Sequence, residues 1–159
     1  PNIRAKLIGV KSRKVPSTMM NWEVYPESIY NLLHKFNQYS EIKDILVTEN
    51  GAAYPDQVTD NSVLDTDRMS YLKLNIQQVL RAKNQGVRVK GYFAWSLTDN
   101  FEWAEGYYPR FGLIYINYTN QQRIIKESAK WYSQFINTYS KEISTKNKTI
   151  ISDDHPVPM

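Results

Sequence analysis

The middle of the sequence alternates between two short β-rich runs and one amphipathic helical stretch. Residues 45–49 (ILVTE) and 87–95 (VRVKGYFAW) are predicted to be strands, and residues 66–85 between them carry apolar side chains at helical spacing. Gly86 follows, at a position suited to ending the helix. A strand, a helix and a strand in this order predict a βαβ unit with parallel strands and a right-handed crossover. The chain is therefore expected to belong to the α/β class.

Two further segments precede the helix of this unit. A helix is expected to begin near Pro26, with Glu27 in its first turn. Asn50 and Gly51 after the first strand are compatible with a hairpin turn or with a strand end that leads into a loop. No alternating strand follows directly, so the loop is favoured, over residues 50–65. The apolar side chains of the first helix lie at helical spacing: Ile29, Leu32, Leu33 and Phe36.

The C-terminal part of the chain changes character several times. Residues 96–112 are rich in aromatic and acidic side chains and are expected to form a loop, followed by a short extended segment at 113–118. A last helix is predicted from about 125 to 139. Residues 141–159 are polar, and we expect them to form an extended or disordered tail.

Composition excludes several classes of function. The chain has 159 residues and no cysteine, which excludes disulfides, thiolate catalysis and cysteine-ligated zinc. Its longest apolar run is far below the roughly 18 residues of a membrane span. The net charge of +4 permits contact with nucleic acid, but no recognition motif supports it. We therefore expect neither a membrane nor a nucleic acid as partner.

Two side chains at strand ends are candidates for a ligand site. Glu49 closes the first predicted strand and Trp95 the second, and parallel α/β sheets bind ligands beyond the carboxyl ends of their strands. A carboxylate beside an indole suits a sugar, whose C–H face packs on the ring. The adjacent Glu102 and Trp103 strengthen this interpretation. The alternatives are a surface carboxylate that caps a loop, for Glu49, and an aromatic lid or interface, for the Glu102–Trp103 pair.

Several longer motifs resemble one family. The segment GYFAWSLTDNFEWAEGYYPRFG at residues 91–112 strongly resembles the C-terminal signature of glycoside hydrolase family 1, the β-glucosidase family. Residues 47–51 (VTENG) are similar to its nucleophile motif, and the resemblance is collinear from about residue 17 to residue 136. Three other stretches contribute to it: NWEVYPESIYNLL at 21–33, DRMSYL at 67–72 and RIIKESAKWYSQFI at 123–136.

This resemblance implies a role for individual residues. Glu49 corresponds to the catalytic nucleophile, and Trp95 to the platform under the sugar at the cleaved bond. Glu102 is similar to the residue that binds the 4- and 6-hydroxyls, Trp103 to the one that reaches the 3-hydroxyl, and Phe111 to an aromatic lining of the glycone pocket. Trp22 is compatible with the outer pocket or with core packing. The resemblance leaves three residues with architectural roles: Arg68, Asp99 and Asn100.

The implied mechanism is retaining hydrolysis of β-D-glucosides through a covalent glycosyl-enzyme, without metal or organic cofactor. It needs a second carboxyl as acid/base, which the family carries in an Asn-Glu-Pro motif that this sequence lacks. Only two strands are predicted, whereas a (β/α)8 TIM barrel needs at least about 200 residues. Pro1 is also not a start methionine. We therefore expect residues 1–140 to be the C-terminal part of such a barrel, with the remaining N-terminal part as partner.

Two other functions remain as alternatives. One is a non-catalytic barrel fragment that binds only a sugar or a complementing partner. The other is a basic, aromatic nucleic-acid binder, suggested only by the sequence pI of about 9.2 and 12 tyrosines. The compartment stays unknown. The absence of cysteine and of a visible signal favours the cytoplasm without deciding it.

Overall fold

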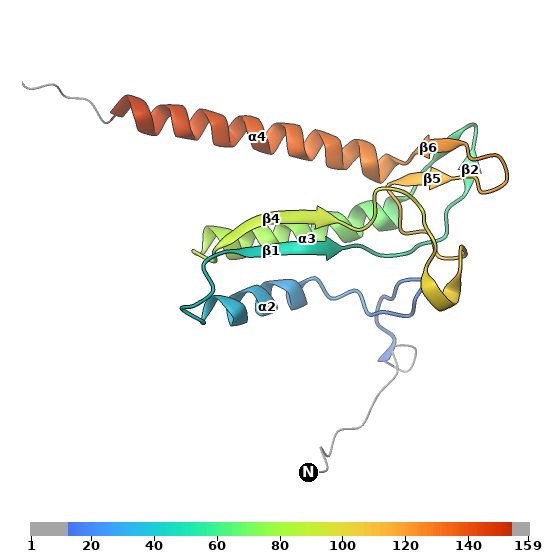
Figure 1. The fold of residues 1–159 in the computed structure, drawn as a ribbon, viewed down its shortest axis with the longest axis horizontal. Helices are drawn as coiled ribbons and strands as arrows, with labels where there is room; N and C mark the ends of the chain where they lie inside the picture. Colours follow the sequence, from blue (N-terminus) through green and yellow to red (C-terminus); the bar gives the residue numbers. More distant parts are fainter. Residues whose placement is uncertain (1–12, 154–159) are drawn as a thin grey trace, which may run out of the picture.

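The computed structural model describes residues 13–153 and contains a parallel strand pair backed by helices (Figure 1). The two predicted strands and the helix between them are present, and the strands pair in parallel, which confirms the βαβ unit. The elements in chain order are α2 (Glu27–Asn37), β1 (Ile45–Asn50), β2 (Val58–Thr59), β3 (Ser62–Val63), α3 (Thr66–Asn84), β4 (Val89–Ala94), the 3-10 helix η1 (Trp103–Glu105), β5 (Ile114–Ile116), β6 (Arg123–Ile125) and α4 (Glu127–Asp153).

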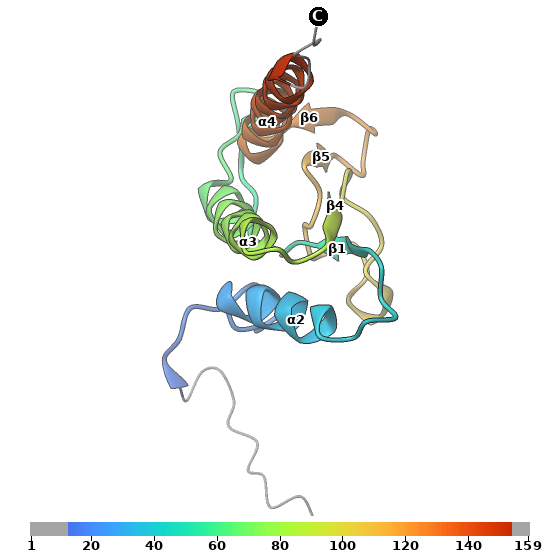
Figure 2. The same cartoon turned by 90° about the vertical axis from the view of Figure 1, so that its left-hand side faces the viewer.

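The helices lie on one side of the β1–β4 pair. Seen from the end of the strands, α2, α3 and α4 form an arc around one face of the pair, and within residues 13–153 no α-helix covers the opposite face (Figure 2). This is the arrangement of a barrel wall, in which helices form the outer layer and the bare face of the strands points inward. Side chains of adjacent residues on a strand point to opposite faces, so each strand contributes to both layers.

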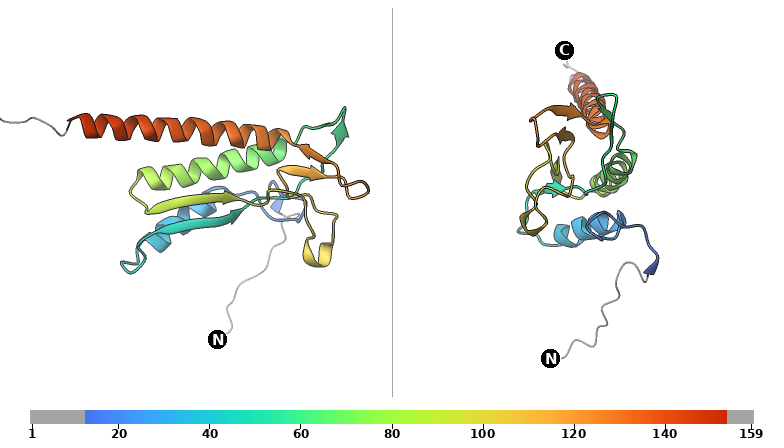
Figure 3. Two further views of the ribbon diagram at one scale, coloured as in Figure 1. Left: turned by 45° about the horizontal axis from the view of Figure 1, so that its top comes forward. Right: turned by 90° about the vertical axis from the view of Figure 1, so that its right-hand side faces the viewer.

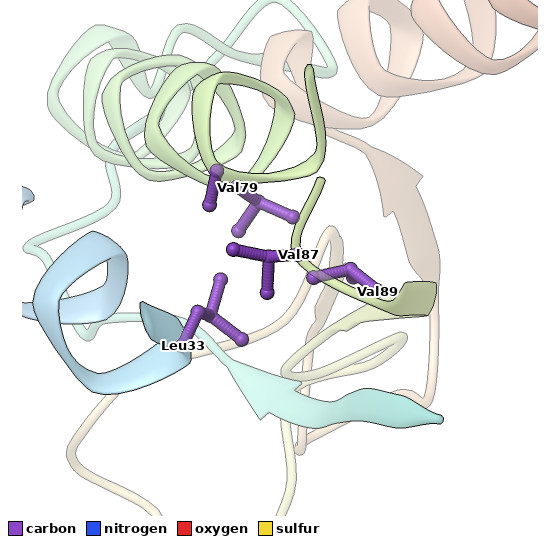
Figure 4. Close-up of a cluster of buried hydrophobic side chains, with 5 residues drawn as sticks. Leu33, Val79, Val87 and Val89 are labelled. Carbon is purple, nitrogen blue, oxygen red and sulfur yellow. The ribbon is translucent and has the colours of Figure 1, made fainter. Parts of the chain in front are cut away.

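The hydrophobic core lies between the strand pair and the helices. Leu33 of α2 and Val79 of α3 meet Val87, which lies just before β4, and Val89, its first residue (Figure 4). Gly86, with φ of 87°, ends α3 in the left-handed conformation and lets the chain turn directly into this core. Burial of these side chains holds α2 and α3 against β1 and β4.

The opposite face of the strands carries exposed apolar side chains. Leu46 of β1 is 55% exposed and Phe93 of β4 is 58% exposed. The two lie on the same face, because a Cβ added to Gly91 would approach both side chains. Val47 and Tyr92, their neighbours in sequence, pack instead against the helical core. Each strand thus presents one apolar surface to the helices and another to the inside of the expected barrel.

Two short hairpins depart from the sequence-based expectation. Residues 50–65 were expected to be loop, but β2 and β3 pair there as an antiparallel hairpin. The last helix was expected from about residue 125, but residues 123–125 form β6, which pairs with β5. The apolar pair Ile124 and Ile125 fits a strand and a helix equally well, and pairing with β5 across the turn of residues 117–122 decides between them.

The C-terminal tail also differs from the expectation. Helix α4 continues to Asp153, so residues 141–153 are helical rather than extended or disordered. The sequence holds no glycine or proline between residue 113 and Pro156, and adding residues to an existing helix costs little once its first turn has formed. Residues 154–159 lie outside the described residues, and the division of the chain at residue 140 stays a prediction.

The core makes a first testable prediction. Val79→Ala removes two methyl groups from the centre of the cluster, and we expect it to lower the free energy of unfolding of the full chain by about 2 kcal/mol. Leu74→Ala on the exposed side of the same helix should change it by less than about 0.5 kcal/mol. Urea unfolding followed by tryptophan fluorescence measures both. Equal midpoints for the two variants would contradict this packing.

Candidate active site

The carboxyl ends of β1 and β4 are held together by backbone contacts. The amide of Trp95 donates a hydrogen bond of 2.9 Å to the carbonyl of Asn50, and Asn50 lies opposite Ala94 in the strand register. A Cβ on Gly51 would lie 1.7 Å from the Trp95 carbonyl oxygen, so only glycine permits this approach. The strand ends that carry Glu49 and Trp95 are therefore neighbours, as the sequence predicts for parallel strands.

Glu49 is exposed beside an open groove of about 560 Å³ between β1 and α2. Thr48, Tyr25 and Glu23 also line the groove. Both carboxylate oxygens of Glu23 accept hydrogen bonds from the Arg13 guanidinium, at 2.7 and 2.9 Å. Glu23 is thus engaged elsewhere, whereas Glu49 is accessible to a ligand.

The side chain of Asn50, next to Glu49, is held by a hydrogen bond from a residue on the face of the sheet that packs against the helices. The Tyr92 hydroxyl donates a 2.7 Å hydrogen bond to the Asn50 side-chain oxygen. Burial, with smaller contributions from Tyr132 and Tyr71, raises the pKa of Tyr92 above the ordinary value of a tyrosine, so the phenol stays protonated and keeps donating in alkaline solution as well as at neutral pH. This bond fixes the position at which β1 ends.

The loop after β4 is closed at its base by backbone and side-chain bonds. The Leu113 amide donates to the Ser96 carbonyl at 2.8 Å, and the Ser96 amide donates to the Phe111 carbonyl at 3.3 Å. The buried Asp99 carboxylate accepts from the Gly112 amide at 2.9 Å. These bonds support the architectural role expected for Asp99. The tip of the loop then projects beyond the carboxyl ends of β1 and β4 (Figure 3).

Glu102 and Trp103 occupy the tip of this loop. The Glu102 amide donates to the Gly106 carbonyl at 2.7 Å, which closes the short turn of η1. Trp103 has a positive φ of 44° and is 83% exposed, while Trp95 at the base is 37% exposed. A tryptophan that stands so far out of the protein is available to a ligand at this end of the sheet.

Phe111 is almost fully buried, whereas a residue that lines an open pocket is accessible to the ligand. It is only 3% exposed, and its ring centroid lies 5.9 Å from that of Trp22, with the planes tilted by 48°. Trp22 itself is half exposed. In the described residues, Phe111 therefore supports Trp22 from below, and Trp22 presents the open aromatic surface.

A buried network of charges lies directly behind the loops and was largely missed by the sequence-based reasoning. Lys126, just before α4, reaches Asp56 at 2.5 Å and Asp99 at 2.9 Å. Arg68 at the start of α3 reaches Asp56 at 3.0 Å and Asp65 at 2.5 Å. Arg110 completes the network by pairing with Asp99 at 3.1 Å. Three cations and three carboxylates balance, as burial of charge requires.

Asp65 links the network to the starts of two helices. It is the N-cap residue of α3, but its side chain makes no cap hydrogen bond. Its carboxylate instead accepts from the Ser128 amide at 2.9 Å and the Ser128 hydroxyl at 2.5 Å. The start of α3 is thereby tied to the start of α4. The pKa of Lys126 is lowered by burial and by Arg68, against the opposing pull of Asp99 and Asp56.

Two absences concern the described part of the chain. Within residues 13–153, no group of three or more His, Cys, Asp or Glu side chains is placed to hold a metal ion. None of the helices described there combines the length and the apolar character needed to cross a bilayer.

Residues 3–141 match the sequence profile of glycosyl hydrolase family 1. The chain belongs to this family. It is 48% identical over 137 residues to a 1,4-beta-D-glucan glucohydrolase of Thermotoga neapolitana, covering 86% of this chain and 31% of the relative. Beta-glucosidase A of Thermotoga maritima is 47% identical over 137 residues, with 86% and 30% covered.

Solved structures of the family agree with the fold. The family 1 β-glucosidase of Thermotoga maritima superposes with a TM-score of 0.77 at 48% identity, over 79% of this chain and 28% of that one. A structure of a β-glucosidase from the same organism in complex with a methoxycarbonyl-substituted glucoimidazole gives the same TM-score. The parallel strands and their helices are therefore part of a (β/α)8 TIM barrel. The chain spans just under a third of the length of these family members.

Proposed function

We propose that this chain supplies the nucleophile and most of the glycone pocket of a retaining β-glucosidase. The observation that carries the proposal is the position of Glu49, exposed at the carboxyl end of β1 and one residue before the bond that joins Asn50 to Trp95. This edge of a (β/α)8 barrel is where the active sites of the fold lie. The β-glucosidases among the relatives support the class of reaction.

In the proposed reaction the Glu49 carboxylate attacks the anomeric carbon of a terminal β-D-glucoside. A glycosyl-enzyme ester forms as the bond to the leaving oxygen breaks, and water then cleaves the ester with net retention. Trp95 supports the sugar ring, Glu102 binds the 4- and 6-hydroxyls and Trp103 reaches the 3-hydroxyl. Phe111 contributes to the glycone pocket indirectly, because its ring packs against Trp22 and supports that side chain. The reaction calls for no cofactor.

The acid/base carboxyl must lie about 5–5.5 Å from the nucleophile in this mechanism. Among the described carboxylates, Glu23 shares the groove of Glu49, but Arg13 holds both its oxygens. We therefore propose that the acid/base comes from the other portion of the barrel, which would also cover the exposed face formed by Leu46 and Phe93. Burial of this apolar face would favour the association.

A hybrid enzyme tests the proposal. The full chain replaces the matching segment of beta-glucosidase A from Thermotoga maritima, and hydrolysis of an aryl β-D-glucoside is measured. We expect turnover by the hybrid and none by the full chain alone, because the acid/base is then missing. Turnover by the pure chain alone would contradict this division of the site. A folded hybrid without turnover would contradict the proposed function itself.

The bare strand edges favour a second, non-catalytic function. In residues 13–153, β1 and β4 pair only with each other, so each has a free edge. Free edges attract further strands. The chain would then be a barrel fragment that only binds a complementing partner or a sugar. Stable association with the remaining portion of the Thermotoga maritima enzyme, without turnover, would support this second function.

Glu102 gives a prediction about the sugar. Glu102→Gln in the hybrid should lower kcat/KM for the glucoside by about 10- to 100-fold, since hydrogen bonds to a charged group are worth about 1.5–3 kcal/mol. It should lower kcat/KM for the 6-deoxyglucoside less, because one of the two hydroxyls is already missing. Glu105→Gln is the matched control, because Glu105 is exposed in the same turn. Equal losses for both variants would contradict the assigned role.

A further inference from the structure

The two segments that carry the proposed site residues share one anchor. Asp56 lies in the segment that follows β1 and Glu49, and Asp99 lies in the loop that carries Glu102 and Trp103. The ammonium group of Lys126 bridges the two carboxylates, at 2.5 Å to Asp56 and 2.9 Å to Asp99. Lys126 belongs to neither segment, so it connects them from outside.

Both ends of this bridge are rigidly held. The Lys126 amide donates to the Leu113 carbonyl at 3.1 Å, which places the lysine at the base of the loop of residues 96–112, here called the glycone loop. Asp99 also accepts from the amides of Gly112 and Ile116. On the other side, Ala52 and Ala53 are fully buried between Gly51 and Asp56. A change in the bridge is therefore passed to the loops and is not absorbed by flexible side chains.

Lys126 itself has no access to a ligand. Its side chain is fully buried, as are those of Asp56 and Asp99. A buried ion pair is weak support for stability, because hydrophobic residues of the same size often serve as well. A bridge between two loops can instead contribute by holding them at one spacing. Misplacement of a reacting group by about 1 Å can cost about 100-fold in rate.

We propose that Lys126 is a positioning residue that fixes the glycone loop relative to β1, the strand that carries Glu49. This inference rests on the proposed function and deepens it. Through Asp56 it holds the segment that continues from Glu49, and through Asp99 it holds the base of the loop with Glu102 and Trp103. It thereby sets the position of a sugar bound to Glu102 relative to the Glu49 carboxylate that attacks its anomeric carbon.

The test compares variants of the hybrid enzyme. Lys126→Met leaves the buried network with three carboxylates and only the two cations Arg68 and Arg110. The informative variant is therefore Lys126→Met combined with Asp56→Asn, which keeps the charges of the network balanced. Lys126→Arg is the conservative variant. Lys130→Met is the matched control, because Lys130 is an exposed lysine of α4 that pairs with Glu127 at the surface. Glu49→Gln checks separately that turnover depends on the proposed nucleophile.

The main measurement is the ratio of kcat/KM for an aryl β-D-glucoside to that for its 6-deoxy analogue. We expect the balanced double variant to lose about 100-fold in kcat/KM for the glucoside and about tenfold in this ratio. Lys126→Arg should recover part of both, and Lys130→Met should change neither. A loss of turnover with an unchanged ratio would show a merely structural role and overturn the proposal, as would wild-type values for both.

Hydrogen exchange provides a readout that does not need turnover. The double variant should exchange faster than wild type in residues 51–56 and in residues 99–112 together, because both segments lose the same anchor. Faster exchange in only one segment, or in neither, would overturn the proposal. An inactive wild-type hybrid, or full activity of Glu49→Gln, would instead contradict the proposed function. The two failures are thus distinguishable.

Discussion

Glu49→Gln is expected to lower kcat of the hybrid enzyme by about 10⁴-fold while the protein keeps its fold. Loss of a catalytic nucleophile removes the covalent route, and such losses in enzymes that act through a covalent intermediate reach this size. Glu49 is exposed, and the amide is nearly the same size as the carboxylate, so the melting temperature should hardly change. Initial rates with an aryl β-D-glucoside, together with thermal unfolding, measure both effects.

Chemical rescue distinguishes a nucleophile from a carboxylate that only binds. Glu49→Gly leaves space at the end of β1, and azide can enter it and attack the anomeric carbon of an activated β-glucoside. A C–N bond forms as the bond to the aryl oxygen breaks, and the product is the α-glucosyl azide, because only one displacement occurs. A β-glucosyl azide, or no rescue, would contradict a nucleophilic role for Glu49.

Glu41→Gln is the matched control for this prediction. Glu41 is also exposed, but it lies before β1, on the side of the sheet away from the carboxyl ends. The same change of charge there should leave kcat within about twofold of wild type, because long-range effects of an exposed charge are screened by salt. A comparable loss in both variants would mean that net charge, and not position, determines the rate.

Gly51→Ala is expected to lower the free energy of unfolding by about 3 kcal/mol or more. Its Cβ would lie 1.7 Å from the carbonyl oxygen of Trp95, and the obstructing atom belongs to the backbone. One strand end must then move away from the other, which breaks the Trp95–Asn50 hydrogen bond and displaces Glu49 from Trp95. The loss should appear in urea unfolding of the full chain and as about 100-fold lower turnover of the hybrid.

Gly91→Ala provides the comparison, because its obstruction is of a different kind. A Cβ there would lie 2.9 Å from the tip of the Leu46 side chain, which is exposed and can rotate away. We expect the free energy of unfolding of the full chain to change by less than about 1 kcal/mol. If Gly51→Ala behaves like Gly91→Ala, the close contact between the strand ends is not as the structure shows it.

The sequence alone predicts the barrel unit because its signals are local. Periodic apolar residues identify α2 and α3, and the β-rich runs identify β1 and β4. Parallel pairing then places Glu49 and Trp95 at the same edge, because carboxyl ends of parallel strands always meet there. The family resemblance adds the expected roles of Glu102, Trp103 and Phe111, and these roles stay predictions.

The remaining features depend on contacts that the local pattern does not reveal. β6 is a strand because it pairs with β5 in a hairpin, and the apolar Ile124 and Ile125 alone fit a strand and a helix equally well. Lys126 and Asp56 belong to polar stretches in which charged side chains normally face water. Their burial depends on the packing of the segment after β1, the loop after β4 and the residues just before α4 against one another, which no local sequence pattern indicates. A lysine followed two residues later by a serine, in the first turn of the predicted helix, was the available signal, and it is too weak to use.

The identity of the nucleophile can be tested by trapping the covalent intermediate. The hybrid is treated with an activated 2-deoxy-2-fluoro-β-D-glucoside, in which the fluorine slows both formation and hydrolysis of the ester. The good leaving group speeds formation alone, so the ester accumulates. Mass spectrometry of the digested protein then locates the label. We predict a fluoroglucosyl group on Glu49 and no label in Glu49→Gln. A label on any other residue, or continued labelling of Glu49→Gln, would contradict the assignment of this chain's central catalytic role.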